Sequence, residues 1–312
     1  MKLGFIGLGK MGSRMALKLL LDKHQLVIWN RSEEAISNFK FQISNNKEAE
    51  NNLKIAKDIQ ELVQTLEAPR VIWLMLPAGE ATQNILDEVS KYVSSGDIVI
   101  DGGNAHFSDT QRRYEDFAKK GIKFLGIGVS GGIIAAQDGY PLMAGGDRSA
   151  YEHIVPILDS LSKPHGGHAY FGEGGAGHFV KMVHNGIEYG MMQAISEGFG
   201  VLEKSPYNLD LLKVAKLWQK GTIVSSFLID RAKDALEKDA TLDGLEGPVA
   251  TSGEADWTIE QAEKEDVDAE NIRQSLEFRK KTQSSENLQK SFVAKMLNAL
   301  RKEFGGHEVK LD

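Results

Sequence analysis

Short apolar runs alternate with amphipathic stretches through the first half of the chain. Helical periodicity predicts helices over Met11–Leu21, Ile59–Leu66, Ala81–Tyr92, Asp109–Lys120 and Tyr151–Leu161. The apolar runs predict strands at Leu3–Ile6, Leu26–Trp29, Val71–Leu76, Ile98–Asp101, Phe124–Val129 and Leu142–Ala144. This alternation is typical of a doubly wound parallel α/β sheet covered by helices. The polar, asparagine-rich segment Phe39–Leu53 predicts an irregular excursion.

The second half has a different pattern, with long helical periodicities over Gly177–Lys204, Leu209–Lys238 and Asn271–Phe304. A glycine-containing stretch, Leu242–Asp256, predicts a loop between them. The second half is therefore expected to be an all-α domain. The glycine-rich residues 172–177 place the boundary between an N-terminal domain, 1–176, and a C-terminal domain, 177–312. A length of 312 residues suits two domains.

Composition narrows the classes of function. The net charge of −7, without a block of lysine or arginine, argues against nucleic acid as a partner. No apolar run approaches the roughly 20 residues that span a bilayer, so no membrane partner is expected. The absence of cysteine excludes disulfides and thiolate chemistry and fits a cytoplasmic location. An anionic substrate would need locally placed cations.

A glycine motif after the first strand indicates a nucleotide site. Gly7, Gly9 and Gly12 form GxGxxG between a predicted strand and a predicted helix, the context of a Rossmann-type dinucleotide-binding domain. Backbone near the ends of the next strands should also skirt the cofactor. The residues expected to contact it are Gly7, Leu8, Gly9, Lys10, Met11, Gly12, Asn30, Arg31, Ser32, Leu76, Pro77 and Ala78.

The end of the second strand bears on the choice between NAD and NADP. NAD sites usually place an acidic residue there for the ribose 2′-hydroxyl, whereas this chain has Asn30, Arg31 and Ser32. A guanidinium and a hydroxyl suit a 2′-phosphate, which favours NADP. Glu33 and Glu34 follow at once and would repel a phosphate if they faced it. NADP is therefore favoured, with NAD as the alternative.

The predicted helix from Gly177 carries the strongest catalytic signal. Lys181, His184, Asn185 and Glu188 recur at i, i+3, i+4 and i+7 in a helix whose other positions are mostly apolar, which predicts a buried helix. Burying an ammonium and a carboxylate is costly unless they face a cavity or each other. A desolvated lysine can act as a base and a desolvated glutamate as an acid. A structural Lys–Glu pair is the alternative interpretation.

Several of these strings together resemble 6-phosphogluconate dehydrogenases of the β-hydroxyacid dehydrogenase superfamily. The strings are GLGKMG, Asp101-Gly102-Gly103-Asn104, Gly128-Val129-Ser130-Gly131-Gly132, the helix KMVHNGIEY at 181–189 and the terminal Arg301–His307. The length resembles the short form, in which the helical domain is not duplicated. The resemblance implies oxidation of 6-phosphogluconate at C3, loss of CO2 and release of ribulose 5-phosphate, in the pentose phosphate pathway.

The resemblance also implies residue roles. Lys181 would take and return the C3 hydroxyl proton, and Glu188 would protonate C1 of the enediol. The carboxylate would be held by Ser130, Gly131 and Gly132 with help from His184 and Asn185. Asn104 would bridge cofactor and substrate. The substrate phosphate would be met by Tyr189, Arg279, Arg301 and His307.

Two positions depart from the long-form pattern. Glu254-Ala255-Asp256 stands before Trp257-Thr258, where long forms carry a phosphate-binding lysine, and Ile133 replaces an acidic residue. Arg279 is aligned by helix context alone, with Arg273 as its rival. The alternatives to a decarboxylase are a non-decarboxylating β-hydroxyacid dehydrogenase and a catalytically silent NADPH-binding protein. No metal is expected, since a β-keto acid decarboxylates without one, and His165, His168 and His178 are interpreted as loop histidines.

The last helical pattern predicts an oligomer. Asn271–Phe304 contains more apolar positions than a terminal helix would hide within its own chain: Ile272, Leu276, Phe292, Met296, Leu297, Leu300 and Phe304. A homodimer or homotetramer would bury them. The resemblance further implies that the C-terminal tail, Arg301–His307, completes the site of a neighbouring subunit.

Overall fold

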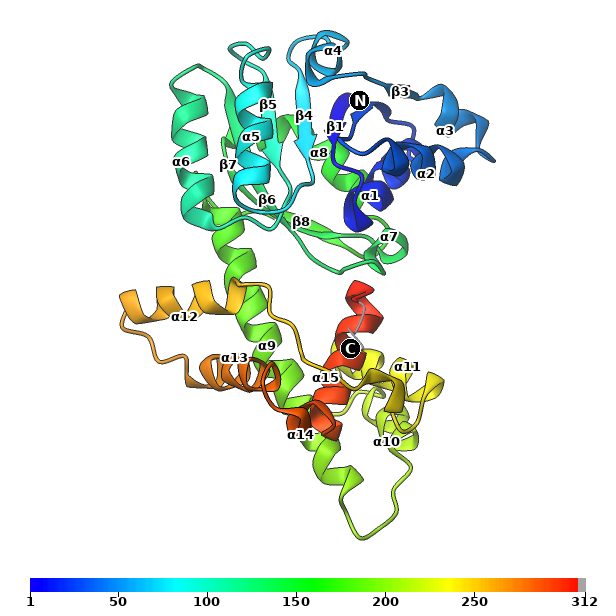
Figure 1. Ribbon diagram of the computed structural model, residues 1–312. Helices are drawn as coiled ribbons and strands as arrows, with labels where there is room; N and C mark the ends of the chain where they lie inside the picture. The colour runs from blue at the N-terminus through cyan, green and yellow to red at the C-terminus, as the bar shows by residue number, and fades with distance from the viewer. Residues whose placement is uncertain (308–312) are drawn as a thin grey trace. The chain divides into compact units, whose positions relative to one another are not determined.

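The computed structural model describes residues 1–307 and contains two compact units (Figure 1). The first unit is Met1–Lys181 and the second begins at Met182. The division falls inside one continuous helix, α9 (Ala176–Glu203), whereas the sequence placed the boundary between residues 176 and 177. Each unit has its own hydrophobic core.

The first unit is built on an 8-stranded sheet in the order β3-β2-β1-β4-β5-β6-β7-β8. The strands from β3 to β6 are parallel, β7 is antiparallel to β6, and β8 is parallel to β7. Their bounds are β1 Lys2–Ile6, β2 Gln25–Trp29, β3 Leu53–Ile55, β4 Val71–Leu74, β5 Ile98–Asp101, β6 Lys123–Val129, β7 Pro141–Gly146 and β8 Gly167–Tyr170. Strand order reverses between β1 and β4, and α/β proteins bind ligands at the carboxyl ends of strands around such a point.

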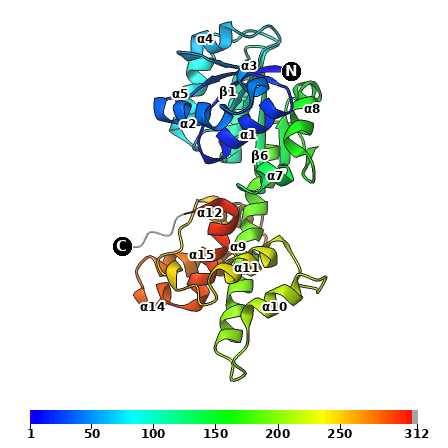
Figure 2. The same cartoon turned by 90° about the vertical axis from the view of Figure 1, so that its right-hand side faces the viewer.

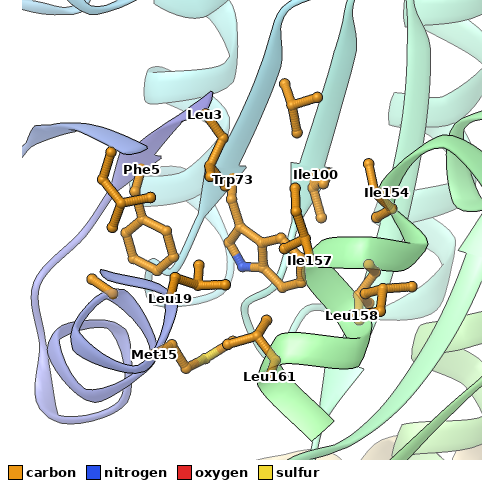
Figure 3. Packing of buried hydrophobic residues seen from close by; sticks show 14 of the residues in the cluster. Leu3, Phe5, Met15, Leu19, Trp73, Ile100, Ile154, Ile157, Leu158 and Leu161 are labelled. Atoms are coloured by element: carbon orange, nitrogen blue, oxygen red, sulfur yellow. The ribbon is translucent and has the colours of Figure 1, made fainter. Parts of the chain in front are cut away.

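Helices cover both faces of this sheet and confirm the α/β class. Their bounds are α1 Lys10–Leu21, α2 Glu33–Ile43, α3 Lys47–Asn51, α4 Ile59–Gln64, α5 Glu80–Val89, α6 Phe107–Ala118, α7 Ala135–Asp138 and α8 Arg148–Ser162. On one face, α1 and α8 pack onto β1, β4 and β5 around the buried Trp73 (Figure 3). On the other face, α4, α5 and α6 bury Leu62, Leu86 and Phe117. Their apolar faces seal the sheet from water, which stabilises both layers.

The expectation of an irregular segment at Phe39–Leu53 is wrong. The segment contains the end of α2, all of α3 and the start of β3. Ser32 and Asn46 cap the two helices by accepting hydrogen bonds from the Ala35 and Ala49 amides. Phe39 and Ile43 are buried, so a few well-placed apolar residues outweigh the polar composition.

The second unit is all-helical, as the sequence predicts. Beside α9 its helices are α10 Leu211–Trp218, α11 Phe227–Lys238, the 3-10 turn η1 Asp243–Leu245, α12 Glu254–Lys264, α13 Glu270–Thr282, α14 Glu286–Gln289 and α15 Phe292–Gly305. Helices α11 and α15 lie side by side in both views (Figures 1 and 2). They enclose Ile229, Leu236, Leu297 and Leu300. Along residues 1–307 no helix is both long enough and apolar enough to cross a membrane.

Two long helices expected here are each divided. Leu209–Lys238 is broken between Trp218 and Phe227, where Gly221 has φ 87° and Ser226 starts α11 by accepting from the Ile229 amide. Asn271–Phe304 is divided into α13, α14 and α15, with Ser285 and Ser291 as caps. The expected loop Leu242–Asp256 also contains η1 and the start of α12. Serine caps explain these breaks because they satisfy amides that a continuous helix would have paired internally.

The apolar positions of Asn271–Phe304 do not require a partner chain. Leu276, Met296, Leu297 and Leu300 are buried within the helical unit. Ile272, Phe292 and Phe304 are partly buried and pack against its two clusters of core residues. The argument for an oligomer drawn from these positions is therefore wrong.

Candidate active site

The predicted cofactor residues gather at one edge of the parallel sheet. They lie in the segments that follow β1, β2 and β4, and Asn104 follows β5. Gly7 has φ 102°, and a Cβ added there would lie 2.3 Å from the Met75 carbonyl oxygen. A Cβ at Gly12 would lie 2.1 Å from the Gly7 carbonyl oxygen. These two glycines are required by the turn itself.

Gly9 has a different reason to be glycine. A Cβ there would meet no heavy atom within 4 Å among the residues that the structure describes. Gly9 is the N-cap of α1 and supplies no capping side chain, so the first amides of α1 are left for another acceptor. An open, positively polarised helix N-terminus fits the pyrophosphate of a dinucleotide.

Asn30 and Ser32 hold local structure, so Arg31 is the cation that follows β2. The Leu8 amide donates to Asn30 Oδ1 at 2.9 Å, so Asn30 anchors the glycine loop to the end of β2. The Ser32 hydroxyl accepts from the Ala35 amide at 3.4 Å as the cap of α2. Arg31 is exposed, and Glu33 lies in the first turn of α2. The arrangement fits a 2′-phosphate through Arg31 more directly than through Ser32.

A buried ion pair holds the loop after β5. Arg113 Nη1 on α6 donates to Asp101 Oδ2 at 2.8 Å, and the two side chains are 2% and 0% exposed. Asp101 Oδ1 accepts from the Gly103 amide at 3.0 Å. A Cβ at Gly103 would lie 2.5 Å from the Leu76 carbonyl oxygen, so this loop lies directly against the one after β4. Asp101 thereby fixes the turn that presents the exposed Asn104.

Sequence reasoning missed Arg113, although a signal was available. Arg113 shares the buried face of α6 with Thr110 and Phe117 at helical spacing. A cation on the apolar face of an amphipathic helix indicates a buried anionic partner.

The loop after β6 places Ser130, Gly131 and Gly132 at the same edge. The Ser130 amide donates to the Pro141 carbonyl at 3.0 Å, which ties the loop to the start of β7. Gly131 and Gly132 have φ of 91° and 58°, conformations that favour glycine. The three residues are half-buried.

Helix α9 carries the four predicted catalytic residues along one side. Lys181 and Asn185 are 7% and 9% exposed, and His184 and Glu188 are half-buried. His184 Nδ1 lies 2.9 Å from Asn185 Oδ1. The prediction of a buried helix is wrong for one side of α9, because Ile187 and Met191 are 52% and 43% exposed. The polar stripe instead lies on the less exposed side of a helix with one apolar exposed side.

Tyr189, Arg279 and Arg301 come together within the helical unit. The Arg279 guanidinium lies 3.5 Å from the centre of the Tyr189 ring, and Arg279 is 2% exposed. Burial lowers the pKa of Arg279 to about 10 and also lowers the pKa of Arg301, while Tyr189 and Glu188 oppose both shifts. The Tyr189 hydroxyl accepts from the Ser252 amide at 3.1 Å. Two partly desolvated guanidiniums suit a phosphate dianion.

The rival Arg273 is not part of this cluster. Its Nη2 donates to Glu263 at 2.9 Å, and the side chain is 37% exposed.

Glu254 is buried, and its charge raises the pKa of Arg301 against the effect of burial. Asp256 accepts from Lys280 at 2.6 Å. His307 is exposed, with its ring 6.4 Å from that of Phe304.

His168 and His178 are not loop histidines. His168 lies in β8, and its Nε2 is 3.0 Å from Asp159 Oδ1. His178 lies in the first turn of α9 and is 1% exposed. Gly174 and Gly175 form a turn just before α9, and Gly177 permits close packing of the helix against the sheet.

Comparisons with known proteins agree with this geometry. Residues 2–174 match the model for the NAD binding domain of 6-phosphogluconate dehydrogenase, and residues 177–311 match its C-terminal domain. The chain is 39% identical to a putative 6-phosphogluconate dehydrogenase of Bacillus subtilis, covering 98% of each. It is 36% identical to an NAD(+)-dependent, decarboxylating 6-phosphogluconate dehydrogenase of Haloferax volcanii, over 99% of this chain and 98% of that one.

Solved structures extend the comparison. A Plasmodium falciparum 6-phosphogluconate dehydrogenase superposes with a TM-score of 0.81 and 30% identity, over 91% of this chain and 62% of that one. A Mycobacterium tuberculosis 3-hydroxyisobutyrate dehydrogenase shares the fold, with a TM-score of 0.71 and 20% identity over 95% and 97% of the chains.

The nucleotide edge and the lysine-bearing helix define a nicotinamide-dependent oxidoreductase with a Rossmann domain and a helical domain. Within that class, the chain belongs to the 6-phosphogluconate dehydrogenase family of the β-hydroxyacid dehydrogenases.

Proposed function

We propose that the protein catalyses oxidative decarboxylation of 6-phosphogluconate to ribulose 5-phosphate and CO2 with a nicotinamide cofactor. The observation that carries the proposal is the placement of Lys181, Asn185 and Glu188 along the less exposed side of α9. The buried Arg279 and the half-buried Arg301, both near Glu188, support a phosphorylated substrate. The names of the relatives support the same reaction.

The residues divide the chemistry between them. Lys181 accepts the C3 hydroxyl proton during oxidation and returns it later, and Glu188 protonates C1 of the enediol after CO2 has left. Ser130, the Gly131 and Gly132 amides, His184 and Asn185 orient the carboxylate. The bound nicotinamide supplies the hydride acceptor. Asn104 orients cofactor and substrate, and the glycine loop of residues 7–12 holds the pyrophosphate.

The substrate phosphate is assigned to the arginine cluster. Arg279 and Arg301 provide two guanidiniums, Tyr189 a hydroxyl and His307 an imidazole. The 254–256 segment contains no cation, and the nearby Lys280 is paired with Asp256, so neither is assigned to the phosphate. The two arginines then carry the charge that long forms share with a lysine.

The direct test is an assay with 6-phosphogluconate and either NAD or NADP. We expect one CO2 released for each cofactor reduced. The 3-hydroxyisobutyrate dehydrogenase of similar fold makes a non-decarboxylating dehydrogenase the second candidate. Cofactor reduction without CO2 would favour that candidate, and cofactor binding without reduction would favour a silent binding protein.

We propose NADP as the preferred cofactor and expect Arg31→Ala to raise the KM for NADP about 10- to 100-fold more than the KM for NAD, as loss of a charge-assisted hydrogen bond predicts. Only NADP carries a 2′-phosphate for the exposed guanidinium. The control is Lys40→Ala, which removes one charge from the last turn of α2. Equal changes for both cofactors would show that Arg31 does not recognise the 2′-phosphate, and Glu33 or Glu34 would become candidates for an NAD ribose.

We also propose a homodimer or homotetramer, on different evidence from the apolar positions of Asn271–Phe304. Large apolar side chains are exposed along the helical unit, with Ile187, Met191 and Val201 on α9 at 52%, 43% and 73% and Leu217 on α10 at 65%. Large apolar side chains that are exposed in one chain are often buried at an interface between subunits. A second subunit would cover it.

Arg301 lies near Arg279 of its own chain, whereas the resemblance implies that the tail Arg301–His307 completes the site of a neighbouring subunit. We propose the second arrangement for the assembled oligomer, and complementation distinguishes the two. Lys181→Met and the double variant Arg301→Ala/His307→Ala should each be inactive alone. If tails act in trans, a mixed dimer contains one site with an intact lysine and an intact tail, so activity partly returns. If heterodimers demonstrably form and mixing restores nothing, the tail acts within its own chain.

A further inference from the structure

The first turn of α9 is seated directly on backbone of the sheet. A Cβ at Gly128 on β6 would lie 2.3 Å from Lys181 Cβ. A Cβ at Gly177 would lie 2.4 Å from the Met143 carbonyl oxygen and 2.5 Å from that of Gly126. No layer of side chains separates helix from sheet at these points. The position of Lys181 therefore follows any small shift of this turn.

Two hydrogen bonds join the start of α9 to side chains of α6: the Gly175 amide donates to Gln111 Oε1 at 3.0 Å, and the other joins two buried side chains. His178 Nδ1 lies 2.6 Å from Thr110 Oγ1, and the two residues are 1% and 0% exposed. A Cβ at Gly126 would lie 2.4 Å from Thr110 Cγ2 and 3.0 Å from His178 Nδ1, so the bond rests on β6. Lys181 follows His178 by three residues, one helical turn later on the same side.

The imidazole is poorly placed to exchange protons with a substrate. Burial lowers the pKa of His178, the neighbouring Arg113 lowers it further, and Asp101 opposes both. The ring is neutral at neutral pH and is enclosed by α6 and β6. Its hydrogen bond to Thr110 can therefore orient the start of α9, but it does not supply a proton.

Helix α6 also holds the loop after β5 that presents Asn104. Arg113, one turn after Thr110, pairs with Asp101, which fixes the loop presenting Asn104. We propose that Thr110 and His178 are positioning residues: through α6, their hydrogen bond holds Lys181 at a fixed position relative to Asn104. The inference rests on the proposed role of Lys181 as proton acceptor. Catalytic groups must be held within about 0.5 Å of their productive geometry, and neighbouring side chains normally supply that constraint.

The test compares Thr110→Val with Thr110→Ser. Valine keeps the shape and removes the hydroxyl, whereas serine keeps the hydroxyl. We expect Thr110→Val to lower kcat about 10- to 100-fold, as a misplacement of about 1 Å predicts. Thr110→Ser should restore most of the rate. Cofactor affinity, measured by quenching of protein fluorescence, should stay near the wild-type value in both variants.

Two controls separate positioning from a general loss of stability. Ser162→Ala removes another buried hydroxyl of the same unit, which donates to the Leu158 carbonyl at 2.7 Å on α8. In a His178→Leu background, Thr110→Val should cause no further loss of kcat, because both changes remove the same hydrogen bond, the one between Thr110 and His178. The acid limb of the pH profile of kcat/KM should move in Thr110→Val and stay in place in Ser162→Ala.

The outcomes are distinct for the two proposals. If Lys181→Met is inactive and Thr110→Val loses no more kcat than Ser162→Ala, the positioning role is overturned and the proton acceptor stands. Additive losses in the double variant would overturn it equally. If Lys181→Met retains the wild-type rate, the proposed function of Lys181 fails first.

Discussion

Lys181→Met is expected to lower kcat about 10²- to 10⁴-fold, the usual contribution of a positioned acid or base. Methionine nearly matches the lysine stem in length and is apolar, so it fits a side chain that is 7% exposed. The glycine loop of residues 7–12 lies after β1 and in the first turn of α1, away from α9, and cofactor binding should be unchanged. The measurements are the rate of cofactor reduction, the rate of CO2 release and the dissociation constant of the reduced cofactor.

Lys204→Met is the matched control for this change. Lys204 follows the end of α9, is exposed and pairs with Glu203 at 3.1 Å. Its loss should leave kcat and cofactor affinity near wild type, because an exposed pair contributes little. CO2 formation at the wild-type rate by Lys181→Met would show that another group accepts the proton.

Most of the fold could be predicted because its signals are local. Buried strands such as Ile98–Asp101 are short apolar runs bounded by glycine, and the structure confirms them. Helix breaks were missed where the decision depends on a single cap, as at Ser226. The strand β8 was missed because its residues, Gly167–Tyr170, are not apolar and are ordered by pairing with β7. Pairing between separated segments leaves little trace in a local pattern.

The candidate site shows the same division between local and distant signals. The stripe from Lys181 to Glu188 could be identified because helical spacing alone places it on one side. Arg113 and His178 were missed as partners because their contacts, Asp101 and Thr110, lie 12 and 68 residues away in sequence. The glycine-rich sequence around His178 led to its interpretation as a loop histidine, but His178 lies in α9, and Gly177 is glycine because α9 approaches β6 and β7 closely.

Arg113→Met is expected to destabilise the first unit by about 3–5 kcal/mol, the usual cost of removing one partner of a buried ion pair. The change leaves the Asp101 carboxylate buried without its guanidinium and also removes the donor to Gln83 Oε1 at 3.0 Å. The carboxylate should then be protonated or draw water into the sheet edge, and either response disturbs the loop that carries Asn104. Hydrogen exchange of the amides of β4 and β5 measures the loss, since these strands open with the core of the unit.

The adjacent arginine provides the control, because Arg112 pairs with Asp109 at 2.9 Å from the exposed side of the same helix. Arg112→Met should cost no more than about 1 kcal/mol. The double variant Asp101→Asn/Arg113→Met should recover part of the stability, since asparagine is uncharged and its carbonyl still accepts from the Gly103 amide. If the guanidinium also fixes the position of α6, kcat of the double variant should stay low although its stability recovers. A stable Arg113→Met protein with slow exchange in β4 and β5 would mean that the loop is held by backbone contacts such as Gly103 against Leu76, and that the ion pair is dispensable for it.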